Sequence, residues 1–327
     1  MSGFKIEDYL IDYAQNEGIA STLCSYHKNF IGGVDSGVLP KAAMSVTTSM
    51  ICDCNINTFR HMEQKHQVES YVLDIPNTYS PEAERYVVGQ LQELIELLET
   101  KTGQKLDMNE LKAAIQRENE SKEYYKAFLK EQKHRYYPNT MTLDLYMLFA
   151  SHLNIGTRET LDFFKCLAED VKTYPEFNGK GILWVHLMPY YQETLQQYMN
   201  YQEKYYIQAC DLNLDYMEPL DVAHPLEALA KKMILNIYNG PYERKVEMIR
   251  HLVKEFQSDA VIHFCHWGCK QSSGGVMLLK EAMREENVPM LILDGDALDR
   301  RNSHDGQIKT RLQAFLELID NIEEDKD

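Results

Sequence analysis

The chain has 327 residues, of which 44% are hydrophobic and 26% are charged, a composition typical of globular proteins with two or three domains. Its net charge of −16 argues against nucleic-acid binding, since phosphate contacts need a basic surface. The sequence contains no run of about 18 apolar residues, and its acid-containing N-terminal segment lacks the apolar core of a signal peptide. We therefore expect a cytoplasmic protein that binds neither nucleic acid nor a membrane.

Residues 1–78 predict a small α/β part. The apolar spacing indicates a helix over Ile6–Glu17, followed by a strand–loop segment around Ser21–Tyr26. Two apolar runs, Met44–Cys52 and Ser70–Ile75, are typical of strands.

Residues 79–175 predict a helical segment. Ser80 is a good N-cap, and Pro81 suits the first helical position of a helix that Gly103 ends. Three further helices are expected from the spacing of apolar residues: one after Asp107, one over Thr142–Leu153 and one over Arg158–Val171.

Residues 176–327 alternate between strand and helix patterns, which predicts a parallel sheet with right-handed crossovers. The expected fold class is thus α/β, with two parallel-sheet α/β domains and a helical insertion between them. The expected strands are Gly181–Met188, Tyr206–Cys210, Ala260–Cys265 and Met290–Leu293, and the expected helices are residues 189–201, 239–256, 276–286 and 308–319.

Three of the seven cysteines stand at comparable places in the predicted elements. Cys24, Cys52 and Cys269 each follow a strand or turn and precede a polar or glycine-containing segment. Loops at the carboxyl ends of strands are where α/β proteins gather ligand groups. Three thiolates that meet there would hold an iron–sulfur cluster with one open iron. Composition leaves a second interpretation open, in which the cysteines are buried thiols that act as small apolar side chains.

Other metal and catalytic motifs fit the sequence less well. Cys265, His266 and Cys269 have no second pair at zinc-finger spacing, and Cys52 and Cys54 would point to opposite faces of an extended segment. The sequence contains no G-x-S-x-G elbow, P-loop or G-x-G-x-x-G motif, which argues against a serine hydrolase and against binding of ATP or NAD by this chain. The acids of LDGDALDRR predict structural ion pairs with nearby arginines.

Taken in order, six segments resemble the family of 2-hydroxyacyl-CoA dehydratase and benzoyl-CoA reductase subunits, to which the D-component of the dehydratase belongs. These segments are LCSYHKNFIGG, TTSMICDCNINTFR, YVLDIPNTYSPEAERYVVGQLQELIELLE, HWGCKQSSGG, VPMLILDGDALDRRN and GQIKTRLQAFLELI. The resemblance covers nearly the whole chain and implies two α/β domains with helical additions. It also implies that relatives extend further before Gly18, so the first α/β part is expected to be shortened.

The resemblance implies a [4Fe–4S] cluster that is bound by Cys24, Cys52 and Cys269. Two extra cysteines provide alternatives: Cys54 in place of Cys52, or both Cys54 and Cys265 in support of a double-cubane [8Fe–9S] cluster. No catalytic residue is assigned.

The resemblance implies an iron–sulfur subunit of a lyase, a 2-hydroxyacyl-CoA dehydratase. Such an enzyme eliminates water from an (R)-2-hydroxyacyl-CoA through a ketyl radical, in a syn-type reaction, after one-electron activation. The implied partners are a second homologous subunit in a heterodimer or homodimer, an ATP-dependent iron–sulfur activator and the acyl-CoA substrate. The alternatives are a benzoyl-CoA-reductase-like or double-cubane reductase and a non-catalytic partner subunit.

Overall fold

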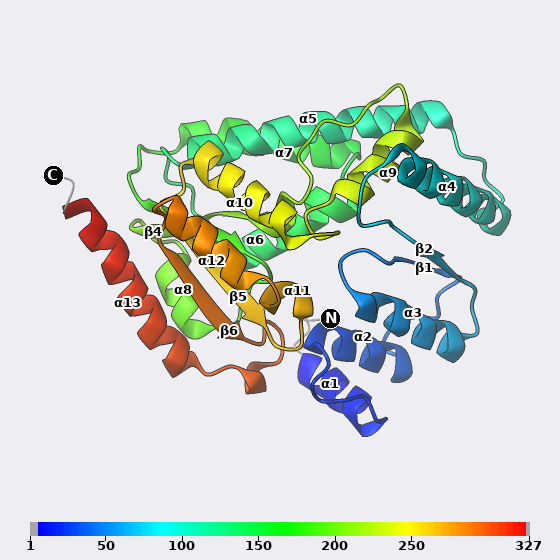
Figure 1. The fold of residues 1–327 in the computed structure, drawn as a ribbon, viewed down its shortest axis with the longest axis horizontal. Helices are drawn as coiled ribbons and strands as arrows, with labels where there is room; N and C mark the ends of the chain where they lie inside the picture. Colours follow the sequence, from blue (N-terminus) through cyan, green and yellow to red (C-terminus); the bar gives the residue numbers. More distant parts are fainter. Residues whose placement is uncertain (1–5, 325–327) are drawn as a thin grey trace.

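The computed structural model describes residues 6–324, and within them the strands form two parallel sheets. The smaller sheet pairs β1 (Ser45–Thr48) with β2 (Ser70–Leu73). The larger sheet has the order β4-β3-β5-β6. Its strands are β3 (Lys180–Val185), β4 (Tyr205–Cys210), β5 (Ala260–His266) and β6 (Met290–Gly295). The predicted α/β class with parallel sheets is therefore confirmed (Figure 1).

The helices of the N-terminal part gather beside the smaller sheet, together with one helix from later in the chain. The N-terminal ones are α1 (Glu7–Asn16), α2 (Ser25–Asp35), α3 (Asp53–His66) and α4 (Pro81–Thr102), and α9 (Pro225–Leu235) packs on α4. As predicted, the Ser80 side chain accepts a hydrogen bond from the Ala83 N–H at the start of α4. The helix ends at Gly103 in the left-handed region.

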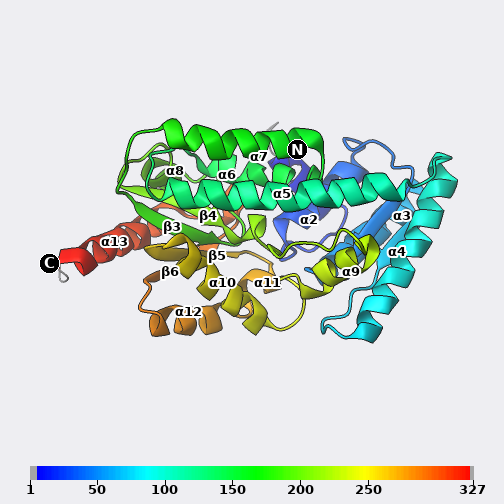
Figure 2. The ribbon, with the colours of Figure 1, turned by 90° about the horizontal axis from the view of Figure 1, so that it is seen from above.

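After α4, the predicted helical segment continues with three helices, one π-helical turn and a short 3-10 turn, η3 (Val171–Thr173). The helices and the π-helical turn are α5 (Met108–Gln132), α6 (Met141–Leu148), η2 (Phe149–Leu153) and α7 (Arg158–Asp170). The long helix α5 packs on α7 and also contacts β4 and α9. Figure 2 shows it lying across the molecule, from the larger sheet towards α9 and α4.

The larger sheet is covered on both faces, as the apolar runs of its strands require. On one face, Leu183, Val185 and Val261 pack against α5, α7, α10 (Tyr242–Phe256) and α12 (Val276–Glu285). On the other face, Trp184 and Phe264 pack against α8 (Glu193–Met199) and α13 (Asp305–Glu324).

The prediction of a strand–loop segment around Ser21–Tyr26 is wrong, because helix α2 begins at Ser25. The segment has few strong helix formers, and tertiary packing stabilises it instead. Helix α2 lies against α1 so closely that a Cβ atom at Gly32 would fall 1.9 Å from the carbonyl oxygen of Leu10. Glycine at this position lets the two helices approach.

Candidate metal centre

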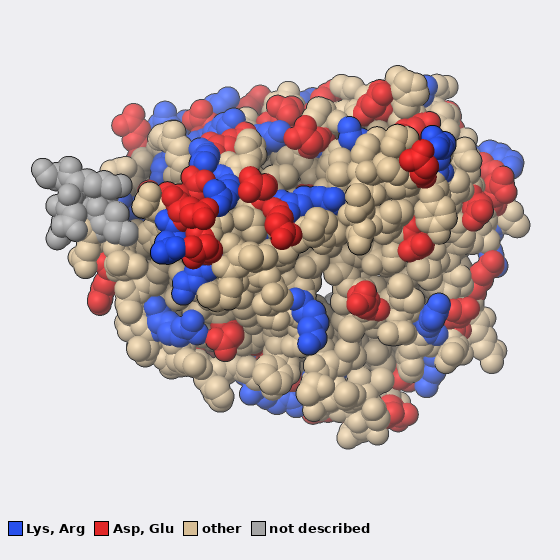
Figure 3. All heavy atoms as spheres, viewed as in Figure 1, with Lys and Arg blue, Asp and Glu red and all other residues tan. Residues whose placement is uncertain are grey.

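Cys24, Cys52 and Cys269 all line one cavity of about 370 Å³. Its walls come from the N-terminal part, from α6 and η2, and from the loops after β3, β4 and β5. Figure 3 shows the surface hollowed between the two parts of the molecule, near the place where Figure 1 labels the short helix α11 (Lys270–Ser273). Three segments that are far apart in the sequence thus contribute one thiol each to the same space.

Cys269 lies at the point where the order of the larger sheet reverses. The chain passes from β3 outward to β4 and then returns to β5 on the other side of β3. Ligands of open α/β sheets bind at the carboxyl ends of two such strands. The turn after β5 contains Gly268 at φ +75° and leads to Cys269, the N-cap of α11. The same strand ends place His186, which follows β3, beside the cavity.

Cys24 is the N-cap of α2, and Cys52 is the N-cap of α3. The turn at Gly268 contacts the first of these segments closely, since a Cβ atom there would fall 2.7 Å from the backbone nitrogen of Cys24. Ile51, directly before Cys52, lines the cavity with a φ of +72°. A β-branched residue in this region is strained. Strain of this kind gathers at functional sites.

Each of the three thiols has a histidine next to it. The Sγ atom of Cys24 lies 3.2 Å from Nε2 of His266, and that of Cys52 lies 3.5 Å from Nε2 of His27. For Cys269 the neighbour is Nε2 of His186 at 3.7 Å. An imidazole N–H near a thiolate stabilises its negative charge by a charge-assisted hydrogen bond.

Burial controls the protonation of these groups. It raises the pKa of the Cys24 thiol to about 12 and that of Cys52 to about 11. Burial also lowers the pKa of His186 well below its usual range and that of His266 to about 4, so both rings are neutral at pH 7. Without a metal ion, Cys24 and Cys52 are therefore thiols, and binding of a metal must release their protons.

The two alternative ligands lie in different surroundings. Cys54 is in the first turn of α3, and the bend at the helix start brings its sulfur within 4.8 Å of ligand atoms of Cys52 and His27. The expectation that Cys52 and Cys54 point to opposite faces held only for an extended segment, and this segment is bent. Cys265 does not line the cavity, and its thiol donates to the carbonyl oxygen of Ser272 over 3.8 Å.

The sequence did not single out His27 and His186 as part of this site. His27 follows Cys24 by three residues, which was the one available signal. The predicted strand Gly181–Met188 includes His186, but β3 ends at Val185 and His186 turns away with a φ of +76°. The cavity also contains Leu148 and His152 of α6 and η2. π-Helical turns are often found at functional sites.

Two of the acids at and after the end of β6 form the ion pairs with arginine that the sequence predicted, and the third, Asp296, has a different role. Asp294 pairs with Arg311 at 2.9 Å, and Asp299 pairs with Arg301 at 2.8 Å. Asp296 is fully buried and forms no ion pair with arginine in the described part of the chain. Its carboxylate accepts a hydrogen bond from the Ser25 hydroxyl, next to Cys24, at 2.5 Å.

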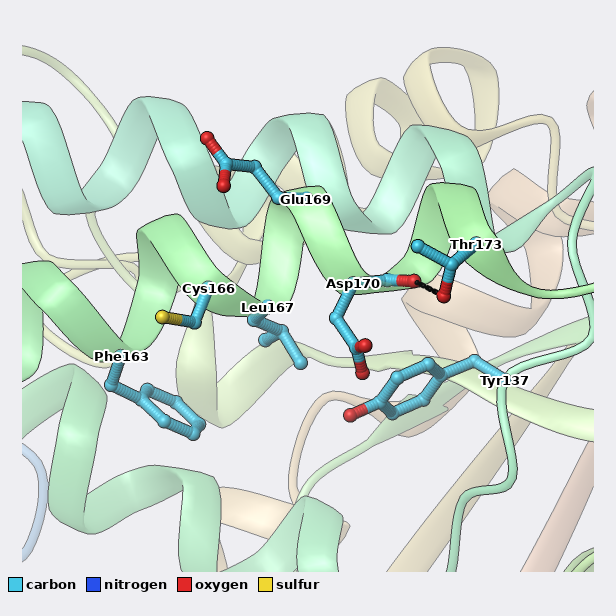
Figure 4. A pocket seen from close by; sticks show the side chains of 7 residues that line it. All are labelled: Tyr137, Phe163, Cys166, Leu167, Glu169, Asp170 and Thr173. Atoms are coloured by element: carbon cyan, nitrogen blue, oxygen red, sulfur yellow. Dashed lines mark hydrogen bonds between the residues drawn. The ribbon is translucent and has the colours of Figure 1, made fainter.

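A second cavity, of about 470 Å³, lies on the surface of α7 (Figure 4). Its lining includes Tyr137, Phe163, Cys166 and Asp170, none of which lines the cavity with the three cysteines. The figure shows Cys166 directed away from Asp170 and Tyr137. This single thiol has no second cysteine or histidine beside it in the lining, so the first cavity is the candidate centre.

Within residues 6–324, every helix is either too short or too polar to cross a lipid bilayer. Figure 3 shows acidic and basic side chains mixed on the visible face.

The family model for the D-component of 2-hydroxyglutaryl-CoA dehydratase matches residues 1–319. The chain belongs to this family, and the resemblance that the motifs indicated is confirmed.

The relatives of the chain are named as subunits of acyl-CoA dehydratases and of a benzoyl-CoA reductase. The chain is 25% identical to the (R)-phenyllactyl-CoA dehydratase alpha subunit of Clostridium sporogenes, over 95% of this chain and 80% of that protein. It is 21% identical to the alpha subunit of lactoyl-CoA dehydratase of Anaerotignum propionicum, over 95% and 82%. It is 19% identical to a benzoyl-CoA reductase subunit of Thauera aromatica, over 94% and 79%.

Proposed function

We propose that the chain is an iron–sulfur subunit of a 2-hydroxyacyl-CoA dehydratase, a lyase that converts an (R)-2-hydroxyacyl-CoA into an enoyl-CoA. The observation that carries the proposal is the meeting of Cys24, Cys52 and Cys269 around one cavity, each with an imidazole beside its sulfur. Two of the relatives named above are alpha subunits of dehydratases, and their names give phenyllactyl-CoA and lactoyl-CoA as the substrates.

The three cysteines fit a cluster better than a single metal ion. Ligand atoms of one tetrahedral ion lie within about 4.6 Å of one another, which is twice a metal–sulfur bond of about 2.3 Å. Among the described residues, the only group that meets a limit of 4.8 Å is His27, Cys52 and Cys54. Cys24, Cys52 and Cys269 are not within this limit as a group, which argues against one ion held by all three, whereas ligands of separate irons in one cluster lie farther apart.

When bound, a [4Fe–4S] cluster with three cysteine ligands supplies a low-potential electron for the ketyl-radical, syn-type elimination and an open iron for the departing hydroxyl. The protein residues have three tasks around it. The cysteines give up their protons and hold the centre. The histidines lie beside the sulfurs, where an imidazole N–H can donate to them. Ile51, Leu148 and Leu187 give the cavity an apolar wall that limits access of water.

The proposed partners are a second homologous subunit and an ATP-dependent iron–sulfur activator. The names of the relatives, which are all subunits, support a multi-subunit enzyme. The second candidate function is a reductase of the same family, with a benzoyl-CoA-like substrate or a double-cubane cluster. The match to a benzoyl-CoA reductase favours it, as does the position of Cys54 beside Cys52.

Iron and acid-labile sulfide analysis after anaerobic purification tests the proposal. We expect about four irons per chain; about eight would favour the double-cubane reductase. Cys269→Ser should remove the iron, whereas Cys166→Ser, at an exposed position outside the cavity, should keep it. A folded wild-type chain that binds no iron in the presence of iron, sulfide and reductant would overturn the proposal in favour of a non-catalytic partner.

A further inference from the structure

The ring of His266, at the end of β5, has a hydrogen-bond partner at both nitrogens. The backbone N–H of Ala297 donates to Nδ1 over 2.9 Å, and Nε2 lies 3.2 Å from the Cys24 sulfur. A backbone N–H can only donate, so Nδ1 must present its lone pair. The proton of the neutral ring is therefore on Nε2, and it points at the sulfur.

The other two histidines of the site are not fixed in the same way. Nδ1 of His27 lies 2.8 Å from the hydroxyl of Thr58, which can either donate or accept. Nδ1 of His186 is buried and has no hydrogen-bond partner in the described structure. Of the three imidazoles, His266 thus combines the shortest distance to sulfur with a tautomer that the backbone determines.

A buried carboxylate holds the two sides of this contact together. Asp296 accepts hydrogen bonds from the backbone N–H groups of Leu298 and Asp299, which shape the loop that contains Ala297. The same carboxylate accepts the hydroxyl of Ser25, the residue after Cys24. One side chain therefore sets both the donor to His266 and the position of the thiol that His266 faces.

We propose that His266 is a positioning residue whose Nε2–H donates to the Cys24 sulfur and raises the reduction potential of the cluster held there. This inference rests on the proposed iron–sulfur function. An added electron increases the negative charge on the sulfur ligands, and an N–H dipole aimed at one of them stabilises the reduced state more than the oxidised state. Loss of the donor must then shift the midpoint potential to more negative values.

Two amide substitutions test the roles of the two ring nitrogens of His266 separately. In His266→Asn the amide oxygen takes the place of Nδ1 and accepts from Ala297, but the side chain is too short to reach the sulfur. In His266→Gln the amide N–H takes the place of Nε2 and reaches it. Both variants keep a polar side chain at this buried position, so the comparison separates loss of the donor to sulfur from loss of polarity.

The measurement is an EPR-monitored redox titration of the reconstituted full-length chain. We expect a more negative midpoint potential for His266→Asn, and a return towards the wild-type value for His266→Gln. Equal potentials for wild type and His266→Asn would overturn the inference while the iron content still supports the proposed function. A wild-type chain without iron would overturn both.

A second measurement tests the hydrogen bond itself without a cluster. In the full-length chain with ¹⁵N-labelled histidine and no added iron, the ring shifts of His266 should be those of the Nε2–H tautomer. The resonances are assigned by their loss in His266→Gln. An Nδ1–H tautomer would contradict the proposed donor whatever the potentials are.

Discussion

The Nζ atom of Lys245 lies 3.0 Å from Oδ2 of Asp211, and both side chains are almost completely enclosed by protein. The same carboxylate accepts hydrogen bonds from the Tyr238 hydroxyl at 2.7 Å and from the backbone N–H of His186 at 2.6 Å. Since His186 faces Cys269, this buried ion pair supports one side of the candidate metal centre.

Removal of one partner from the Lys245–Asp211 pair should lower the stability of the folded chain strongly. Lys245→Met leaves the Asp211 carboxylate buried without its cation, and we expect a loss of about 3–5 kcal/mol in the free energy of unfolding. Urea denaturation measures it. As a control, Arg85→Met breaks the exposed ion pair with Glu82 and should cost less than about 1 kcal/mol. Equal losses in the two variants would contradict the buried role of Lys245.

The turn at Gly268 gives a prediction for the metal content. Gly268→Ala places a methyl group 2.7 Å from the Cys24 backbone and adds strain at φ +75°. We expect it to displace Cys269 and to lower the iron bound per chain. Gly37→Ala is a matched control, because Gly37 has the same φ of +75° and open space around its Cβ position. An equal iron content in the two variants would show that the close contact does not matter.

The surroundings of the extra cysteines predict the size of the cluster. Cys265 lies outside the cavity, so Cys265→Ser should keep the wild-type iron and sulfide content. For a [4Fe–4S] cluster with Cys52 as the ligand, Cys54→Ser should also keep it, while Cys52→Ser loses it. If instead Cys54→Ser and Cys265→Ser each lost about half of eight irons, a double-cubane cluster would be indicated.

Asp144 of α6 gives a prediction for the pH dependence of stability. Burial raises the pKa of this carboxyl to about 7, against about 3.9 in an unfolded chain. The native state therefore binds the extra proton between these values, so this group makes stability fall as pH rises from about 4 to about 7. Below about pH 4 the Asp144 carboxyl does not lower the stability, and above about pH 7 its destabilising effect is complete.

Urea midpoints measured between pH 4 and pH 8 should reveal the contribution of Asp144 to stability when the wild type is compared with Asp144→Asn, which cannot ionise. The wild-type midpoint is expected to fall relative to that of the variant as pH rises across this range. Parallel profiles for the two proteins would mean that the Asp144 carboxyl has an ordinary pKa in the folded chain.

Much of the fold follows from local patterns in the sequence. Continuous apolar runs predicted the strands of the larger sheet, since both of its faces are buried. The helix from Pro81 was marked by its cap residue and by Gly103. Helix α2 was missed because it has few strong helix formers and is stabilised by contacts such as that of Gly32 with Leu10. Helices α3 and α9 were missed as well, although both contain several strong helix formers, so their local pattern alone would have predicted them.

The candidate site was predicted only in part, for a physical reason. The three cysteines could be chosen because each precedes a polar or glycine-containing segment. Their histidine neighbours could not, because His266 and Cys24 meet only through the folded chain, and His186 depends on the point at which β3 ends. Such pairs leave no periodic pattern in the sequence.

The distribution of the three cysteines along the chain limits when the proposed centre could be assembled. Cys24 and Cys52 are synthesised well before Cys269 and the loop after β5, which complete the lining of the cavity. A nascent chain therefore has no complete set of thiols to offer. If the proposed cluster is held by all three cysteines, it can be completed only after Cys269 has been synthesised and has reached the other two.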